Sequence, residues 1–373
     1  MNKFYKKKQK ASNHKAANIL IIFLLVICFV AGLGTQKIEA AMVKVWETEE
    51  YGNLEVLGAR SRMYQGDGTA WYKYDTTDPA IYTSTGSPLN MPPGATVIKA
   101  FILWGGIEKD PGGATSHLYL RTPKNAATLA ASTRITSQGR QFASLPYGQH
   151  NAYYADVTSL VQSGGNGWYY VYNYKDDKNS VYLSEAWTMY VYYKDTTDKY
   201  RYMSFYYGGE EVRIGTKSFS VAGIKTPVVG PVTGRFASTI LWSSLNEVDW
   251  VKINGTQLSG YKTPANDYAN SESVAKGATL VMKPPVGALG VREFQIKSLN
   301  LNGNEIGNNV TSVKFDLYCA GFDTWLGMGW TFDLLDATPK MEKTAANLTD
   351  STSVPQKDDI VEYTIKLIAE GTK

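Results

Sequence analysis

Cysteine is scarce in this sequence of 373 residues, which contains only two. One of them, Cys28, lies in an apolar segment near the N-terminus, so Cys319 is the only cysteine in the rest of the chain. No internal disulfide is therefore expected. A chain of this length can instead stabilise its fold by burying apolar side chains, and the alternation around Cys319 predicts that its thiol is a small buried hydrophobic group.

Catalytic motifs are also missing. Beyond the N-terminal segment the only histidines are His117 and His150, and no nucleophile elbow, HExxH motif or phosphate-binding glycine loop accompanies them. Each histidine is expected in a half-buried strand or turn. The two carboxylates of a glycosidase would have to converge from separate strands, which residue spacing does not reveal. We expect no catalytic residues, no enzymatic activity and no cofactor.

Acidic residues are paired in three loops but form no recognisable metal-binding motif. Calcium requires six to eight oxygen ligands, and no loop has the ligand pattern of an EF-hand. We expect solvated turns and leave metal binding open. The loop residues are Asp75 and Asp78, Asp176 and Asp177, and Asp195 and Asp198.

The N-terminal residues have the composition of a secretory signal. Six lysines within the first 15 residues precede an apolar run over residues 19–30, and small residues follow in "KIEAAMV". The apolar run is shorter than a membrane span of about 20 residues, so a cleaved signal is expected, with cleavage after Ala40 or Ala41. An uncleaved anchor is the alternative. The bulky Ile27 before Cys28 is atypical of a lipoprotein site. We expect a secreted or cell-surface protein that contacts the membrane only through this segment.

Removing the signal changes the charge of the chain. Residues 42–373 contain 31 lysines and arginines and 33 aspartates and glutamates, a net charge of −2. The basic balance of the whole sequence therefore belongs to the signal, and nucleic acid is not an expected partner.

Period-two hydrophobic alternation dominates the remaining sequence and predicts an all-β, antiparallel β-sandwich or jelly-roll-like domain. Asn254 and Gly255 in "INGT" predict a two-residue hairpin turn. One short helix is predicted in "ADVTSLVQSG", capped by Asp156. The predicted strands cover residues 96–104, 168–174, 186–193, 200–207, 218–224, 247–253, 291–299 and 310–320.

Tyrosine and tryptophan are abundant in these strands. One interpretation is that aromatic rings suit a pleated, half-buried surface and form stable cross-strand pairs. The other is an aromatic ligand-binding surface for sugars or proteins, on the condition that the sheet is covered on one side only. The residues predicted for such a surface are Tyr169, Tyr170, Tyr192, Tyr193, Tyr206 and Tyr207.

The composition changes near Ala337, where a polar segment with Pro339 and Pro355 begins. We predict three parts: a signal peptide (1–41), a β-sandwich surface domain (42–337), and a linker with an incomplete Ig-like β repeat (338–373). Val361, Tyr363 and neighbouring alternate residues predict a strand in "DIVEYTIKLIAEGTK" with an exposed edge prone to pairing.

Four segments in order resemble the bacterial conserved-repeat surface proteins of the isopeptide-forming, fimbrial or cell-wall-anchored adhesin type. They are "PPGATVIKAFILWGG" (92–106), "YYADVTSLVQSGGNGWYYVYN" (153–173), "AWTMYVYYKD" (186–195) and "FSVAGIKTPVVGPVTGRFA" (219–237). The resemblance spans roughly residues 57–337. It implies a Gram-positive origin and a non-enzymatic domain that tandem β repeats hold away from the cell wall.

The segment after residue 337 resembles the opening of such a repeat. In isopeptide-forming relatives a first-strand lysine bonds to an asparagine on a late strand, and the resemblance implies Lys340 or Lys343 for that lysine. The late strand is missing from the sequence, so no bond is assigned. The sequence also has no LPxTG-like sorting motif, so it departs from the pattern of proteins that are covalently anchored to the cell wall.

These features predict a secreted, non-catalytic protein that acts in adhesion or as an envelope component, with a host or cell-surface protein or glycan as partner. The alternatives are a lectin-like carbohydrate-binding module, a carbohydrate-active enzyme, or a toxin whose amphipathic hairpins form pores.

Overall fold

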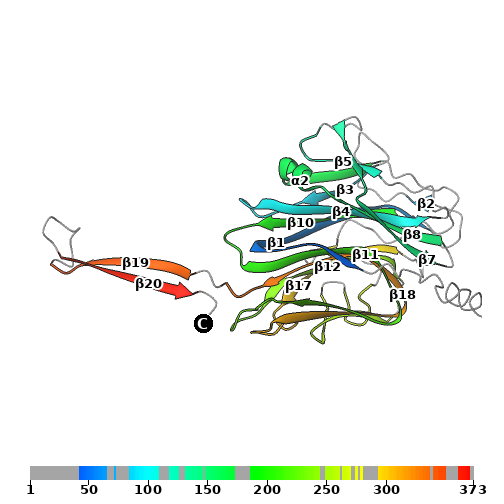
Figure 1. The fold of residues 1–373 in the computed structure, drawn as a ribbon. Helices are drawn as coiled ribbons and strands as arrows, with labels where there is room; N and C mark the ends of the chain where they lie inside the picture. The colour runs from blue at the N-terminus through cyan, green and yellow to red at the C-terminus, as the bar shows by residue number, and fades with distance from the viewer. Residues whose placement is uncertain are drawn as a thin grey trace, which may run out of the picture. The chain divides into compact units, whose positions relative to one another are not determined.

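A computed structural model describes most of the chain after residue 41 and confirms an all-β, antiparallel sandwich fold (Figure 1). The described residues are 42–64, 71–72, 84–108, 117–125, 131–145, 148–172, 185–243, 248–260, 263–269, 274–275, 278–279, 293–336, 339–349 and 360–369. The predicted signal peptide therefore lies outside the described residues. Within these residues, no helix has the length and apolar character needed to cross a membrane.

The larger sheet has the strand order β16-β15-β17-β12-β18-β11-β1-β10-β4-β8-β7, with β13 and β14 branching from β18 and β2 from β1. All its pairings are antiparallel except that of β15 with β17. The strands are β1 (Val43–Tyr64), β2 (Trp71–Tyr72), β4 (Thr96–Glu108), β7 (Gly139–Leu145), β8 (Gly148–Asp156), β10 (Glu185–Lys194), β11 (Tyr200–Ala222), β12 (Thr233–Ser243), β13 (Asp249–Ile253), β14 (Thr256–Gln257), β15 (Val274–Ala275), β16 (Ala278–Thr279), β17 (Glu293–Asn302) and β18 (Ser312–Asp333).

A smaller sheet of four antiparallel strands has the order β3-β9-β5-β6. Its strands are β3 (Ser84–Leu89), β9 (Gly167–Tyr172), β5 (His117–Arg121) and β6 (Thr133–Thr136). The helix α2 (Thr158–Gly164) forms where it was predicted, between β8 and β9. Val157 is its N-cap, and Asp156 accepts a hydrogen bond from the Thr158 N–H at 2.9 Å, so Asp156 lies one residue earlier than a capping residue.

Three apolar clusters lie between successive layers of sheet. One cluster joins the inner face of the four-stranded sheet to β1, β4, β8 and β10. A second joins the opposite face of those strands to β11, β12, β17 and β18. The third lies on the other face of β11, β12 and β18, with β13. The central strands therefore have a core on both faces, whereas the described residues form a core on only one face of the four-stranded sheet.

Strand β1 joins two of these layers. Its first part pairs with β11, and from Gly52 onward it pairs with β10. Gly52 has φ +141°, and a Cβ there would lie 1.9 Å from the Tyr193 carbonyl oxygen. Only glycine fits this change of partner without displacing the backbone.

The predicted turn and several predicted strands are confirmed. Asn254 (φ 47°) and Gly255 (φ 86°) form the two-residue turn that joins β13 to β14. The segments predicted at 200–207 and 218–224 are parts of one long strand, β11. The register between β11 and β18 shifts between Tyr207 and Glu210 and again between Arg213 and Gly215. These local irregularities lie within one continuous strand, although the sequence predicts two separate strands there.

The segment after residue 338 contributes a separate two-stranded sheet. β19 (Pro339–Asn347) pairs with β20 (Val361–Ala369) in a continuous antiparallel register. The predicted strand at residues 361–369 is therefore confirmed, and its partner lies upstream.

Candidate aromatic binding face

Five of the six tyrosines predicted to form a ligand surface are buried: Tyr169, Tyr192, Tyr193, Tyr206 and Tyr207. The prediction of an exposed aromatic surface is wrong for these five because the strands that carry four of them have a core on both faces. On β10, Tyr192 and Tyr193 point into two different clusters, and the adjacent tyrosines of β11 do the same. Tyr169 points into the cluster under the four-stranded sheet.

Tyr170 is the one predicted tyrosine that lies on an outer face. Strand alternation directs Tyr169 inward and directs Trp168 and Tyr170 outward from β9. Trp168 is 41% exposed, which is high for tryptophan in a regular strand. The four-stranded sheet therefore presents a pair of aromatic rings on the face opposite its core.

The exposed rings form an ordered stack with a cation. The ring centroids of Trp168 and Tyr170 are 5.8 Å apart, and their planes are inclined by 24°. The Arg121 guanidinium carbon lies 4.4 Å from the centroid of the Tyr170 ring. Offset stacking and a cation over a ring face are both favourable arrangements, so the three side chains support one another's orientation.

The pairing of the strands explains why these groups meet. One cross-strand row contains Gly86 of β3, Tyr170 of β9 and Arg121 of β5. A Cβ at Gly86 would lie 2.5 Å from Cδ1 of Tyr170, so the tyrosine ring occupies the space that a side chain on β3 would fill. Glycine at this position lets the Tyr170 ring lie across the neighbouring strand.

The inner face of the same strands provides a rigid support. The Tyr169 hydroxyl donates a hydrogen bond to the Gly165 carbonyl oxygen at 2.8 Å, and burial raises the pKa of this phenol. A Cβ at Gly164 would lie 2.6 Å from the same hydroxyl oxygen. Tyr169 therefore fixes β9 to the end of α2, directly beneath the exposed rings.

Strands β5 and β6 extend the outer face. His117, Tyr119 and Arg121 are partly exposed, whereas Leu118 and Leu120 are buried. The His117 and Tyr119 rings are 6.0 Å apart in an edge-on arrangement. The exposed Arg134 of β6 lies directly opposite Tyr119 in the strand register. The resulting surface, which we call the aromatic face, consists of His117, Tyr119, Arg121, Arg134, Trp168 and Tyr170.

The chemistry of the aromatic face suits binding. Planar rings present polarisable surfaces on which the C–H faces of a ligand can stack, and the arginines and the histidine can donate hydrogen bonds. The four strands of this sheet contain no aspartate or glutamate. A general acid or an acidic nucleophile would therefore have to come from other segments.

A second aromatic pair lies on the larger sheet. Trp250 of β13 and Tyr318 of β18 are directly paired, with centroids 4.9 Å apart and planes inclined by 10°. Lys252 Nζ lies 4.1 Å from the Trp250 ring centroid. Both rings are only partly exposed, and the neighbouring Asp316 forms an ion pair with Lys314 at 2.8 Å. This pair has neither the exposure of Trp168 nor the single-sign charge of the aromatic face.

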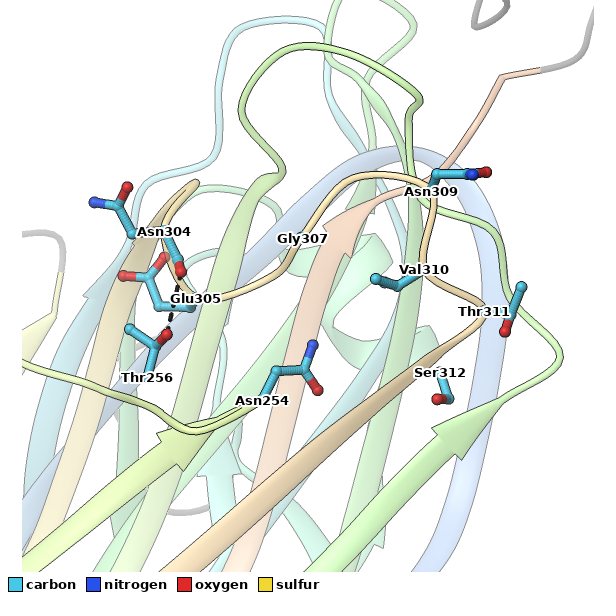
Figure 2. Close-up of a pocket in the computed structure, with 9 residues that line it drawn as sticks. All are labelled: Asn254, Thr256, Asn304, Glu305, Gly307, Asn309, Val310, Thr311 and Ser312. Carbon is cyan, nitrogen blue, oxygen red and sulfur yellow. Dashed lines mark hydrogen bonds between the residues drawn. The ribbon is translucent and has the colours of Figure 1, made fainter.

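A polar pocket of about 590 Å³ opens beside the turn between β13 and β14 (Figure 2). Its polar groups hold its own loops together. Asn254 Oδ1 accepts from the Lys314 N–H at 2.8 Å, and the Thr256 hydroxyl donates to the Asn304 carbonyl at 3.2 Å. Glu305 accepts from the Asn302 N–H at 2.9 Å. The described residues that line the pocket include no aromatic ring, so we assign it a role in loop structure.

Ionisable side chains are also buried in the core around β17. Asp249 is 1% exposed and Lys297 is fully buried, and their opposite charges attract. Asp249 Oδ1 accepts a hydrogen bond from the Ala269 N–H at 2.6 Å. Burial, with the nearby Asp267 charge, raises the pKa of Asp249 to about 7. This cluster links β13, β17 and the segment at residues 263–269, and we assign it a structural role.

The other predicted polar sites have simple structural environments where they are described. His117 is half-buried on β5, as predicted, and Cys319 is buried, with burial raising the pKa of its thiol. Asp195 accepts from the Thr197 N–H at 2.9 Å within its own turn, and Asp198 forms an ion pair with Arg201.

Several predicted sites lie wholly or partly outside the described residues. His150 is on β8, but its side chain is not described, and the same holds for Lys340 and Lys343 on β19. An isopeptide bond from either lysine therefore remains a prediction. The acidic residues of the other two loops also lie outside the described residues: Asp75, Asp78, Asp176 and Asp177. In the described part of the chain, no group of three histidine, cysteine or acidic side chains is placed to hold a metal ion.

Most residues of the aromatic face are not predicted from the sequence. Trp168 lies in a predicted strand but is not among the residues predicted for a ligand surface, and residues 117–121 lie outside the predicted strands. The available signal was the alternation in "HLYLR", which directs Leu118 and Leu120 to one face and the other three residues to the opposite face.

No protein-family model and no curated protein sequence matches this chain. Among solved structures, the chain is similar to PNGF-II, with a TM-score of 0.23 and 10% sequence identity. The match covers 80% of this chain and 66% of PNGF-II, so this chain spans slightly less than two thirds of the PNGF-II length. Two others are the ANX2 ectodomain from Arabidopsis thaliana (TM-score 0.20, 8% identity, 74% of this chain and 96% of that one) and N-glycanase F (TM-score 0.18, 10% identity, 79% and 96%). Similarities this weak carry no argument about function.

Proposed function

We propose that this protein is an exported, non-catalytic glycan-binding protein whose binding site is the aromatic face of the four-stranded sheet. The observation that carries the proposal is the exposed stack of Trp168 and Tyr170 with the Arg121 guanidinium. Burial of a tryptophan ring would stabilise the fold, yet Trp168 is 41% exposed on a regular strand, and exposed apolar groups rimmed by polar ones are typical of binding sites.

Saccharides suit this surface better than an apolar ligand does. A pyranose ring has an apolar C–H face and a polar rim, so it can stack on Trp168 while its hydroxyls meet the polar side chains of the face. Arg121 and His117 lie on the same side of the sheet as the two rings. The support of the core and α2 holds the rings in place before a ligand arrives, which lowers the entropic cost of binding.

The predicted signal peptide supports a role outside the cell, where glycans are abundant. The resemblance to bacterial surface proteins supports adhesion as the use of this binding. In that role the protein attaches to a cell-surface or host glycan without cleaving it.

A glycan array tests the proposal. Residues 42–373 are applied as the wild type and as the Trp168→Ala variant, and Trp250→Ala serves as a matched control because it removes a stacked tryptophan from the other sheet. We expect the wild type and Trp250→Ala to bind the same glycans and Trp168→Ala to lose that binding. Circular dichroism checks that all three proteins are folded. A blank array for the folded wild type would overturn the proposed function.

A further inference from the structure

The charged side chains of the aromatic face are all positive. Its charged residues are Arg121 and Arg134, and the exposed Lys124 lies in the turn that follows β5. The four strands carry no aspartate or glutamate, and neither does α2. Among the described residues of this sheet and of α2, a ligand lying along the strands therefore meets charged side chains of one sign only.

The two arginines are close enough to act on one ligand. Arg134 lies opposite Tyr119 on the neighbouring strand, and Arg121 is two residues further along β5, so the arginines are diagonal neighbours. Diagonal positions on paired strands are about 7–8 Å apart. Both side chains belong to the outward-facing residues of their strands.

Arginine is also the residue type suited to an anion at a stacked site. A guanidinium can lie flat on a ring through its face and direct N–H groups outward in its own plane, where a carboxylate accepts two of them. The Arg121 guanidinium lies over the Tyr170 ring, which is the starting geometry for such a contact.

From this arrangement we infer that the aromatic face selects acidic saccharides, whose carboxylate or sulfate groups contact Arg121 and Arg134 while a sugar ring stacks on Trp168. The inference rests on the proposed function and names the ligand class of the same site. The second aromatic pair provides the contrast, because Asp316 lies opposite Lys252 beside Trp250 and Tyr318 and forms an ion pair with Lys314, so charges of both signs are present there.

The experiment compares acidic polymers with neutral polymers of the same backbone. Polygalacturonate, alginate and hyaluronate are each paired with their carboxyl-reduced form, and binding to residues 42–373 is measured at low salt. We expect at least one acidic polymer to bind 10-fold or more tightly than its reduced form. We also expect this ratio to fall as added salt screens the exposed charges.

Three substitutions then locate the effect. Arg134→Gln should lower the affinity for the acidic polymer about fivefold, whereas Arg213→Gln, an exposed arginine of β11, should leave it unchanged. Trp168→Ala should abolish binding to both polymers of a pair, and circular dichroism confirms that each variant is folded.

The failures of the two proposals are distinguishable. If no acidic polymer binds more tightly than its reduced form, the selectivity for acidic saccharides is wrong. If the glycan array then shows Trp168-dependent binding of neutral glycans, the proposed function stands. If Arg134→Gln and Arg213→Gln weaken binding equally, the charge effect is not located at this face and the inference is also wrong.

Discussion

Adjacent tyrosines on β9 have opposite roles at the scale of the single residue. Tyr169 is buried and bonded to the Gly165 carbonyl, whereas Tyr170 lies in the exposed stack. Tyr169→Phe should therefore lower the free energy of unfolding by about 1 kcal/mol, the usual value of one hydrogen bond, and leave glycan affinity unchanged.

Tyr170→Ala should have the reverse effect. It should leave stability within about 1 kcal/mol of the wild type, because the residue is on the outer face, and weaken glycan binding at least 10-fold. Urea unfolding and titration with a glycan from the array measure the two quantities. Equal losses of affinity in both variants would contradict the division of roles.

The buried Asp249 gives the molecule a specific pH dependence. Its pKa is raised to about 7 in the folded state, against about 3.9 in an unfolded chain. Between these values the folded state binds more protons than the unfolded state, so the contribution of Asp249 to stability is complete below pH 4 and is lost as the pH rises through 7.

Asp249→Asn should remove this contribution, since asparagine does not ionise. The wild-type free energy of unfolding minus that of the variant should fall between pH 4 and pH 8, by an amount on the order of 3 kcal/mol. Urea unfolding of both proteins across this range measures the difference. A difference that rises with pH would show that Asp249 is ionised and stabilised in the fold.

At the scale of the element, period-two alternation predicts the strands β4, β9, β10, β11, β13, β17, β18 and β20 and the Asn254-Gly255 turn, whereas strands such as β1 and β12 are not predicted. The reason is that alternation and turn chemistry are local properties of the chain. The number of covered faces is not local. The sequence around Tyr192 and Tyr193 is compatible with a strand that has one exposed face, but β10 lies between two cores and both residues are buried.

The change of pairing partner within β1 depends on one glycine. Gly52→Ala would place a side chain at φ +141° and a Cβ within 1.9 Å of the Tyr193 carbonyl oxygen. We expect a loss of about 3 kcal/mol in the free energy of unfolding.

Gly215→Ala is the matched control for this substitution. Gly215 lies at an irregularity of β11, and a Cβ added there would lie 3.5 Å from the Arg213 carbonyl oxygen, an ordinary contact distance. The substitution should change stability by less than about 1 kcal/mol. Similar losses for both substitutions in thermal unfolding would show that the crossing at Gly52 has no special requirement.

The hairpin of β19 and β20 should be the least stable described element. It is a two-stranded sheet, and Tyr363 and Ile365 are 59% and 57% exposed. Isolated two-stranded sheets are marginally stable in water. Hydrogen exchange of the β19 and β20 amides should be complete within about a minute at neutral pH, while β11 and β18 stay protected for hours. Equal protection of the two regions would contradict this account.

At the scale of the whole molecule, the layered arrangement decides where a ligand can bind. Central strands with a core on both faces have no surface for a ligand, so their tyrosines serve packing. In the part of the chain that the structure describes, the four-stranded sheet has a core on one face, and its other face carries the stacked rings and the arginines. Sequence patterns could predict that tyrosines are abundant in strands, but which sheet is outermost follows from the packing of the complete chain.

Binding through this outer face is the central claim, and a fluorescence titration tests it most directly. Glycan from the array is added to the wild type, Trp168→Ala and Trp250→Ala, and tryptophan emission is recorded. We predict a saturable change of equal midpoint in the wild type and Trp250→Ala, and no change in folded Trp168→Ala. An unchanged titration in Trp168→Ala would show that the aromatic face is not the binding site.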